Sequence, residues 1–562
     1  MAKIIVGIDF GTSTTVVRWR KEDSDEIHEI KDLNNQTVID SVIFIPDNGG
    51  NWIYGGKASA RSSGRGKFIR NFKMDLINPD TKDQAILYIR KFMEYVHSRF
   101  INQIEAEGIN YDSMDIYISY PVKWTIEEKK LMKDIVVDSG FGLHGNIIGM
   151  TEPKAAAIDL MRIHIPHLTK TGILKTNNPL KIMMLDMGAG TSDLFIFQLT
   201  MKSNGEIVIP EDKIFQYPVS EQSYNCGGRE VDEILFKDVV DYLTKGNIEK
   251  AKQLYKIEYA KYWKDQVLSD ELRGVGLFEG DPLKANDIKE NAICEGKWNN
   301  SVGEYKMSRN KFENITETHW MNLYRLIENG MAKSKQECKI GTEDIDLIFL
   351  TGGHSQWYCV PNLFNGKGIN GTIGLSTKHN TLNFSKIINE EWRVLQGTNP
   401  QEIVARGLCW TEAIKIPSKA ENDIWIQIGV HGIKNNKYSK YKKIVSKGEI
   451  LPCKINIDNC ETEYNTIIYS RDIGEELRWF EIELNIIEGE RISKFELPIK
   501  DSNFFHEIFT VFASFIKKYI DYKFSYTADI SILEDGSLTL SGKLNYDDKK
   551  EYCFTDKDLK IL

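Results

Sequence analysis

One sequence pattern occurs twice in this chain, and its two copies stand 177 residues apart. The copies are IIVGIDFGTSTTVVRW, which contains Asp9, and KIMMLDMGAGTSDLFIF, which contains Asp186. Each copy has an apolar strand that ends in an aspartate, then a turn with glycine and hydroxyl residues, then a second apolar strand, so each predicts a β-hairpin. Such a turn lets backbone N–H groups approach an anion, and the strand-end carboxylate can hold a metal-bound water. One such hairpin alone favours an ordinary glycine turn, whereas two facing hairpins favour binding of a polyphosphate with its Mg²⁺.

Two further motifs place polar residues at the ends of predicted elements. In IDLIFLTGGHSQW, residues 346–350 predict a buried strand, and the glycines at 352 and 353 allow the backbone to pass close to a planar or phosphorylated ligand. A simple strand-to-helix turn is the alternative. In GMTEPKAAAIDLM, Thr151 is expected to cap a helix that begins at Glu152 and Pro153, where the helix dipole favours a carboxylate.

The pattern of the chain changes near residue 416. Up to that point short β-branched runs alternate with longer helical patterns, which is typical of α/β units. From Asp423 onward, alternating segments such as WFEIELNII and SLTLSGKL predict an antiparallel β-domain, with one helical segment around 504–519. We therefore expect an α/β domain at 1–416, a linker at 417–422 and a β-domain at 423–562.

The composition indicates which kinds of partner and which cellular compartment to expect. The 562 residues include 72 basic and 81 acidic side chains, and the net charge of −9 gives no overall positive field toward nucleic acid. The eight cysteines form no C-x-x-C pair, which fits a reducing compartment better than disulfides or a zinc site. The start of the chain does not resemble a secretory leader, and no apolar run approaches the ~18 residues that span a bilayer. We expect a cytoplasmic protein without nucleic-acid or membrane partners.

These motifs together resemble the actin-fold ATPases and, within them, the heat-shock protein 70 (DnaK-type) chaperones. GIDFGTSTT and LDMGAGTSD resemble the two phosphate loops, FLTGGHS the adenosine loop, and TEPKAAAI the connecting helix. CGGREVDEILF resembles the start of the fourth subdomain and NPQEIVARG the helix after the adenosine loop, while IIEGER and ILEDGSLTLSGK resemble the peptide-binding β-domain. The resemblance implies an α/β actin-like ATPase with two ribonuclease-H-like lobes, roughly 1–178 and 179–416, followed by an antiparallel β-sandwich.

The resemblance also implies roles in binding ATP or ADP with Mg²⁺ and in ATP hydrolysis. Asp9, Asp186 and Asp193 would hold Mg²⁺ largely through water. Lys73, in RNFKMDL, resembles the catalytic lysine that holds the γ-phosphate and the attacking water, and an exposed lysine near a helix start is the alternative. Glu152 would sense the nucleotide and communicate with a switch proline at 121. The other candidate catalytic or nucleotide-binding residues are Thr191, Gly11, Thr12, Ser13, Thr14, Gly188, Ala189, Gly190, Gly227, Gly228, Glu258, Lys261, Gly352, Gly353 and His354.

The chain also departs from the family pattern. Lys129 stands where the family has a relay arginine, Gln401 where it has an aspartate, and the adenosine loop reads Gly-Gly-His-Ser-Gln instead of Gly-Gly-Ser-Thr-Arg. The pair Glu258 and Lys261 matches the family's Glu-x-x-Lys, but Lys264 offers a competing register and solvated helix charges explain the pair equally well. The acidic, leucine-rich linker is replaced by KIPSKAEND, and a helical lid is expected to be absent.

The expected function is therefore a slowly ATP-hydrolysing chaperone that couples nucleotide state to the binding of a peptide or unfolded protein. J-domain proteins and nucleotide exchange factors are the partners that the resemblance implies. A small-molecule kinase of the same fold is one alternative, but a kinase needs a carboxylate base beside its acceptor hydroxyl, and no motif supplies one. An actin-like filament-forming or scaffold ATPase is the other, and there the β-domain would have no obvious use.

Overall fold

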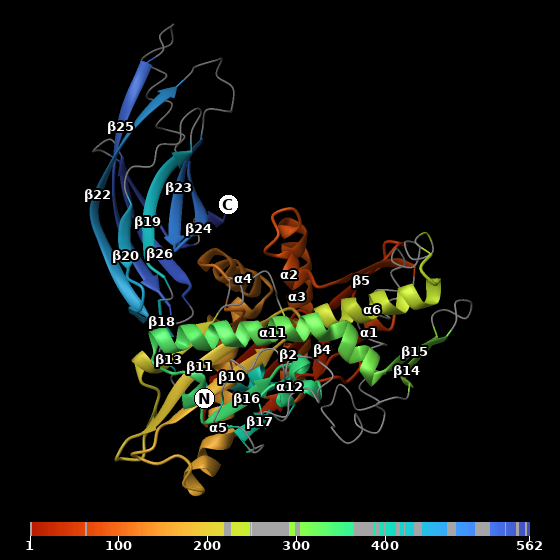
Figure 1. The fold of residues 1–562 in the computed structure, drawn as a ribbon. Helices are drawn as coiled ribbons and strands as arrows, with labels where there is room; N and C mark the ends of the chain where they lie inside the picture. The colour runs from red at the N-terminus through yellow and green to blue at the C-terminus, as the bar shows by residue number, and fades with distance from the viewer. Residues whose placement is uncertain are drawn as a thin grey trace. The chain divides into compact units, whose positions relative to one another are not determined.

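The computed structural model describes most of the chain (Figure 1). The described residues are 3–61, 65–122, 124–217, 226–247, 249, 292–297, 304–364, 384, 386–387, 390, 393–397, 399–411, 416, 418–420, 422–431, 441–468, 479–500, 518–533, 536–546, 550–556 and 559–561. The chain divides into two compact units, Met1–Lys123 with Lys133–Ile416, and Trp124–Met132 with Pro417–Leu562. Each unit is described by itself.

Two mixed sheets with the same strand order form the frame of the first unit. In each sheet the first strand of a hairpin pairs in parallel with a later strand, and that strand pairs in parallel with another. The first sheet runs β3 (His28–Glu29), β2 (Thr14–Lys21), β1 (Lys3–Phe10), β8 (Ser113–Tyr120) and β9 (Gly145–Thr151), and β4 (Val38–Asp40) pairs with β2. The second runs β12 (Ile207–Val208), β11 (Ser192–Met201), β10 (Leu180–Met187), β16 (Leu347–Thr351) and β17 (Val394–Gln396), and β13 (Ile214–Tyr217) pairs with β11. The antiparallel pairs β1–β2 and β10–β11 confirm both predicted hairpins.

Smaller sheets and helices complete the first unit. The sheets are β6 (Ile53–Tyr54), β5 (Val42–Pro46) and β7 (Gly66–Arg70), and β14 (Ala292–Lys297) with β15 (Glu304–Ser308). The α-helices are α1 (Gly56–Ser59), α2 (Phe72–Asp75), α3 (Lys82–Ala106), α4 (Ile126–Asp138, divided between the units), α5 (Glu152–Lys170), α6 (Gly228–Thr244), α11 (Arg309–Glu337), α12 (Cys359–Asn362) and α14 (Ile403–Leu408). The 3-10 helices are η1 (Phe141–Leu143), η2 (Glu211–Lys213), η5 (Thr342–Asp344) and η6 (Gly353–Gln356). Within the described ranges, none of the helices is both long and apolar enough to cross a membrane.

Helices α5 and α14 pack against strands of both large sheets. One core cluster combines Ile5 of the first sheet and Ile182 of the second with Ala156 of α5 and Leu408 of α14. The central strands β1 and β10 are buried almost continuously, as expected for strands covered on both faces. This packing fixes α14 beside β1, and the carboxyl ends of the central strands are brought toward one region of the unit.

The second unit consists mainly of two antiparallel sheets. One runs β20 (Lys442–Val445), β19 (Ile424–His431), β23 (Trp479–Glu488), β24 (Arg491–Lys500) and β28 (Lys560–Ile561). The other runs β22 (Cys453–Ile468), β25 (Lys518–Ile532), β26 (Leu538–Tyr546) and β27 (Lys550–Phe554), and β18 (Ser418–Lys419) pairs separately with β21 (Ile450–Leu451). Apolar side chains of both sheets share one core, for example Ile426 and Leu484 with Ile530 and Leu540.

The predicted antiparallel pairing in this region is confirmed. Strands β19, β23 and β24 pair antiparallel in sequence, as do β25 and β26. The turn between β25 and β26 has Gly536 at φ +76°, and the N–H of Leu533 donates to the carbonyl of Ser537 at 2.7 Å. Of the helix expected around 504–519, residues 504–517 lie outside the described residues, and Lys518 and Tyr519 belong to strand β25 instead.

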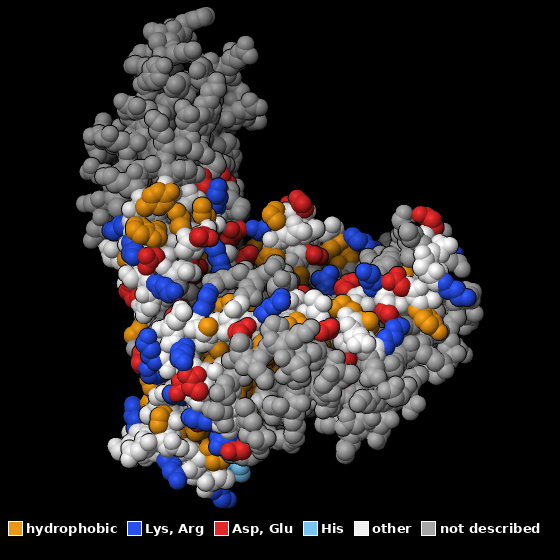
Figure 2. All heavy atoms as spheres, viewed as in Figure 1, with side chains coloured by type: hydrophobic (Ala, Val, Ile, Leu, Met, Phe, Trp, Pro, Cys, Tyr) orange, Lys and Arg blue, Asp and Glu red, His pale blue; other side chains and the backbone are white. Residues whose placement is uncertain are grey.

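Charged side chains of both signs are interspersed over the described surface seen in Figure 2. This distribution accords with a chain in which acidic residues slightly outnumber basic ones.

Candidate active site

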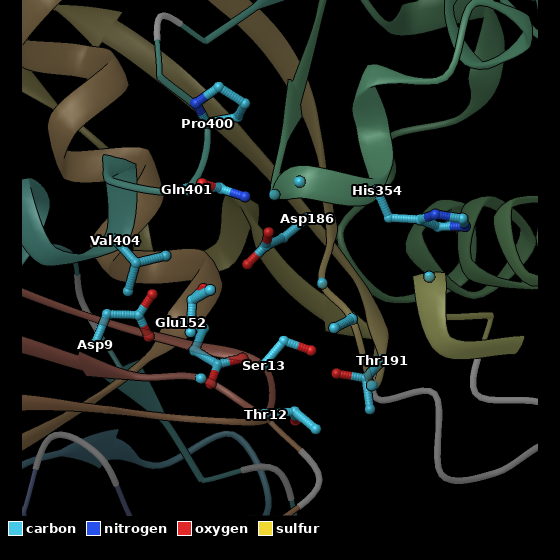
Figure 3. A pocket seen from close by; sticks show the side chains of 18 of the residues that line it. Asp9, Thr12, Ser13, Glu152, Asp186, Thr191, His354, Pro400, Gln401 and Val404 are labelled. Carbon is cyan, nitrogen blue, oxygen red and sulfur yellow. The ribbon is translucent and has the colours of Figure 1, made fainter. Parts of the chain in front are cut away.

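A cavity of about 360 Å³ lies in the first unit where the two hairpin turns meet the loop after β16 (Figure 3). Helices α2, α5, α6 and α14 also contribute to its lining. Sixteen of the candidate residues line it, and so do two other positions singled out in the sequence, Pro121 and Gln401. The sixteen are Asp9, Gly11, Thr12, Ser13, Thr14, Lys73, Glu152, Asp186, Gly188, Ala189, Gly190, Thr191, Gly228, Gly352, Gly353 and His354.

The two hairpin turns have the same backbone closure. In the first, the N–H of Gly11 donates to the carbonyl of Thr14 at 2.9 Å, and in the second, the N–H of Gly188 donates to the carbonyl of Thr191 at 2.9 Å. Thr12 and Ser13 of the first turn lie beside Thr191 of the second (Figure 3). The two turns therefore present hydroxyl groups to the same cavity, an arrangement that suits an anion with several oxygens.

The first turn is held from outside by Ser41, which follows strand β4. The N–H of Ser41 donates to the carbonyl of Ser13 at 2.8 Å, and its hydroxyl donates to the carbonyl of Gly11 at 3.0 Å. The same hydroxyl lies 2.8 Å from Oγ1 of Thr15. A single residue thus holds the first turn through both its backbone and its side chain.

The second turn is held by the beginning of α6. The N–H groups of Gly228 and Arg229 donate to the carbonyls of Gly188 and Ala189, at 3.0 and 2.8 Å. Gly227 makes this approach feasible, because a Cβ there would lie 2.6 Å from the carbonyl oxygen of Ala189. Gly227 itself does not line the cavity, so among the described residues its position indicates a packing role.

Carboxylates converge on the floor of the cavity. Burial, and then the negative charge of Glu152, raises the pKa of Asp9 from 3.8 to about 6, while Lys73 and a hydrogen bond from Ser119 to Asp9 Oδ1 at 2.6 Å act in the opposite direction. Burial raises the pKa of Asp186 well above its ordinary value, and the charges of Glu152, Asp193 and Asp9 add to that effect. The site therefore concentrates negative charge that a cation would stabilise.

Lys73 is buried within this carboxylate group. Its side chain is 4% exposed, and Nζ donates to Oε1 of Glu152 at 2.7 Å. The ammonium also lies 5.7 Å from the centre of the Phe10 ring. The alternative of an exposed lysine is therefore wrong, and the charge of Lys73 lies within the cavity wall.

Two sequence expectations are modified by the structure. Thr151 holds the N-cap position of α5 but makes no side-chain capping hydrogen bond, because strand β13 places Gln216 so that its Nε2 donates to Thr151 Oγ1 at 3.1 Å. Asp193 pairs across the second hairpin with Asp186 and is buried, but it does not line the cavity. It acts on the cavity through its charge on Asp186.

The donor set fits Mg²⁺. The acidic side chains that line the cavity near Lys73 are Asp9, Glu152 and Asp186, all hard oxygen donors. Within the described ranges, no three histidine, cysteine or acidic side chains converge closely enough to bind a metal ion directly. A Mg²⁺ bound here would therefore keep most of its waters, which is its usual preference.

Some residues that support or line the cavity were missed in the sequence. Ser41 contacts the first turn from 30 residues away and Ser119 contacts Asp9 from 110 residues away, and no local motif marks them. Asp232, which lines the cavity, stands four residues after Gly228 on α6, and this helical spacing could have identified it. Met74 and Trp357 also line the cavity and read as ordinary core residues.

Some expectations stay untested in this region. Glu258 and Lys261, with the competing Lys264, lie outside the described residues. Lys129 is buried in the segment of α4 that belongs to the second unit. Its relay role, like the roles of the cavity residues, stays a prediction.

Comparison with known proteins identifies distant relatives that share the name chaperone protein DnaK. No protein-family model matches the chain. The chain is 22% identical over 359 residues to the chaperone protein DnaK of Thermosipho africanus (strain TCF52B), a match that covers 62% of this chain and 52% of the relative. It is 23% identical over 377 residues to DnaK of Ureaplasma parvum serovar 3, covering 65% of this chain and 54% of the relative.

The chain thus spans about half the length of the curated relatives it matches. These matches support a distant relation to the heat-shock-70-type chaperones. The mixed sheets with parallel strands are compatible with the actin-like ATPase fold that this relation suggests.

Proposed function

We propose that this protein binds and slowly hydrolyses ATP, and that it is a heat-shock-70-like chaperone whose nucleotide state controls the binding of a peptide or unfolded protein. The observation that carries the proposal is the convergence of two equivalent turns, the Lys73–Glu152 pair and two strand-end aspartates on one cavity. The relation to DnaK supports the chaperone part.

The turns would contact the phosphates. Backbone N–H groups and the hydroxyls of Thr12, Ser13, Thr14 and Thr191, which line the cavity, would be the donors where charge develops on the transferred phosphoryl group. The glycines at 352 and 353 would lie against the adenosine. His354 and Gln401 replace family residues here, so the preference for adenine over guanine is one of the properties to be measured.

Lys73 would position the γ-phosphate. Its ammonium is held by Glu152, and Glu152 begins the helix that packs against both large sheets. Bound Mg²⁺ would supply charge neutralisation at the phosphates. Asp9 and Asp186 would hold its waters in place, and Asp193 would add to the charge behind Asp186.

The antiparallel sheets at 423–562 would bind the client as a β-sandwich. We propose that Glu152 and Pro121, which both line the cavity, transmit the nucleotide state. J-domain proteins and nucleotide exchange factors are the matching partner classes, and a cytoplasmic location accords with them.

The test combines calorimetry with turnover. ATP, ADP and GTP would be titrated into the full chain with and without Mg²⁺, and ATP hydrolysis would be measured with and without a peptide library. We expect Mg²⁺-dependent ATP binding, slow hydrolysis and a change in peptide affinity between ATP and ADP. Rapid phosphate transfer to a small hydroxyl compound would favour the kinase alternative. ATP-dependent sedimentation of the chain would favour a filament.

A further inference from the structure

A line of hydrogen bonds leads from the third cavity loop away from the cavity. The ring of His354 points away from the carboxylates in Figure 3, and its Nδ1 lies 3.0 Å from Nε1 of Trp357. Its Nε2 lies 2.9 Å from Nε2 of His319 on α11. Nδ1 of His319 lies 3.0 Å from Oε2 of Glu230, in the first turn of α6.

Only one arrangement of protons satisfies this line. An indole N–H is always a donor, so Nδ1 of His354 accepts, and the neutral ring carries its proton on Nε2. That proton is donated to Nε2 of His319, which therefore carries its own proton on Nδ1 and donates it to Glu230. Each ring nitrogen of the two histidines is engaged, and an added proton would remove one of the bonds.

The two histidines lie in an apolar surrounding. His354 and His319 are 3% and 2% exposed, and the His354 ring stacks on Trp320 with centroids 5.4 Å apart and planes 12° apart. Trp357 stacks in turn on Phe312. Burial, and then the neighbouring His319, lowers the pKa of His354 well below its ordinary 6.5.

The titratable groups around the line come from α11, from α6 and from the residues that neighbour them. Within the described residues they include His319 and the buried Glu313 from α11, the latter accepting from the Tyr358 hydroxyl next to Trp357, Glu230 from α6, and the Cys226 thiol just before α6, whose pKa burial raises to about 12. The Glu230 side chain is 38% exposed, so the line ends at solvent. Protons can therefore reach it without passing through the cavity.

The line connects parts that shape the cavity. His354 and its loop line it directly, and Glu230 stands two residues after Gly228, whose N–H holds the second hairpin turn. We propose that Glu230, His319 and His354 are positioning residues that tie the third cavity loop to α6 and α11, and that protonation of His354 releases the loop. This proposal rests on the proposed nucleotide function for its consequence, which is faster nucleotide release in acid.

The direction of the pH effect follows from linkage. In the closed loop His354 stays neutral, whereas an opened loop would expose it to water, where it titrates near 6.5. The closed loop is therefore fully favoured above pH 6.5. Below that value the opening equilibrium constant rises by up to about tenfold for each pH unit, until the pKa of the closed state is reached.

The experiment uses the full chain and two readouts that need no nucleotide. Nitrogen–proton correlation spectra of the imidazole rings should show the proton of His354 on Nε2 and that of His319 on Nδ1. Amide hydrogen exchange at 352–357, corrected for intrinsic rates, should report an opening constant that rises about fivefold between pH 6.5 and 5.5. Dissociation of a fluorescent ATP analogue should accelerate over the same interval.

Matched variants distinguish an effect of the hydrogen bonds among Glu230, His319 and His354 from a general loss of stability. His354→Gln should remove the pH dependence of opening. Glu230→Ala should raise opening by about fivefold to tenfold at pH 7.5, and Glu230→Gln, which keeps an acceptor, should restore it. His97→Gln is the control, because its ring pairs with His144 at 3.0 Å in the same way but does not line the cavity.

Two results would overturn the proposal: a proton on Nδ1 of His354, or the same pH dependence of opening in His354→Gln as in the wild type. The ring spectra of the wild type decide the first point even if a variant fails to fold. If no nucleotide binds while the exchange data follow the expectation, the proposed function fails and the tie stands.

Discussion

The turn at Gly11–Thr14 and the turn at Gly188–Thr191 share one backbone closure and differ in what holds them. The first is held by one residue, Ser41, through its hydroxyl as well as its backbone N–H, whereas the second is held by backbone N–H groups at the start of α6. Side-chain support can be removed by one substitution, but backbone support can be disturbed only by moving the helix. The second turn should therefore depend on packing and the first on a single residue.

The aspartates of the two hairpins differ in a similar way. Asp9 has Val16 opposite it on the next strand, whereas Asp186 has Asp193, a second acid. The pKa of Asp9 rises to about 6, and that of Asp186 rises well above its ordinary value with Asp193 among the causes. A repeated backbone has thus produced two positions with unequal charge, and the second is expected to depend more strongly on a bound cation.

The largest expected effect comes from Lys73, the cation that acts on both aspartates. Lys73→Ala should lower kcat for ATP hydrolysis by roughly 10²–10³ and change ATP affinity much less, if the ammonium acts mainly on the γ-phosphate in the transition state. Single-turnover kinetics and calorimetry measure the two quantities. Lys57→Ala, at an exposed position on α1, is the control. Loss of binding with persistent turnover would make Lys73 an anchor instead.

The next effect separates the two hairpins. Asp9→Asn and Asp186→Asn should each lower ATP hydrolysis on the order of 10², because each removes charge from the Mg²⁺ site. Asp186→Asn should also stabilise the nucleotide-free protein more than Asp9→Asn does, as measured by urea unfolding. Asp115→Asn, in the same sheet as Asp9 but outside the cavity lining, is the control. Unchanged turnover in both variants would contradict the site assignment.

A pH series tests the charge of the first aspartate. A carboxyl group whose folded pKa exceeds its unfolded value binds more protons when folded, so its contribution to stability falls as pH rises from 3.8 to about 6. A pKa rise of this size corresponds to a change of about 3 kcal/mol in the free energy of unfolding. Because cavity water screens part of this effect, we expect a change of roughly 2 kcal/mol. The measurement is the difference in unfolding free energy between wild type and Asp9→Asn at pH 4 and 7, without nucleotide. A difference independent of pH would contradict the raised pKa.

Gly227→Ala tests the support of the second turn. The added Cβ would meet the carbonyl of Ala189 at 2.6 Å, so α6 must shift. We expect a loss of stability of about 1–2 kcal/mol and weaker nucleotide binding. Thermal unfolding and nucleotide titration measure both, and an unchanged affinity would show that the second turn does not need α6.

Ser41→Ala gives the smallest expected effect. It removes the hydroxyl that contacts Gly11 and Thr15 but leaves the backbone bond from Ser41 to Ser13, so about 1 kcal/mol should be lost. Ser41→Thr should keep most of this stability, and chemical unfolding measures all three proteins. A loss as large as that of Gly227→Ala would remove the distinction between the turns.

The backbone of the site could be predicted from the sequence because its signals are local. An aspartate at the end of an apolar strand and glycines in the turn define a hairpin within about a dozen residues, and both hairpins form as expected. The partners that fix charge and orientation could not be predicted in this way. Ser119 reaches Asp9 across 110 residues and His319 reaches Glu230 across 89, so only tertiary packing brings them together.

The same limit explains one error and one alternative that the sequence left open. The sequence predicts that the Thr151 hydroxyl caps α5, but this hydroxyl instead accepts from Gln216, on a strand 65 residues away. Lys73 was open between a cavity position and a solvent position because a four-residue helix gives no periodic burial pattern. The partner of its ammonium is Glu152, which the sequence places 79 residues away.

The length of α11 gives the histidine tie a mechanical consequence. The helix has 29 residues, and at 1.5 Å per residue it is ~43 Å long, with His319 about a third of the way along it. The arm from His319 to Glu337 is then ~27 Å, so a tilt of about 5° at the histidine would move the far end by ~2 Å. Beyond that end, Nζ of Lys213 donates to the carbonyl of Cys338 at 3.2 Å. A displacement of ~2 Å exceeds the tolerance of such a hydrogen bond, so a tilt of that size at the histidine would break a contact ~27 Å away from it.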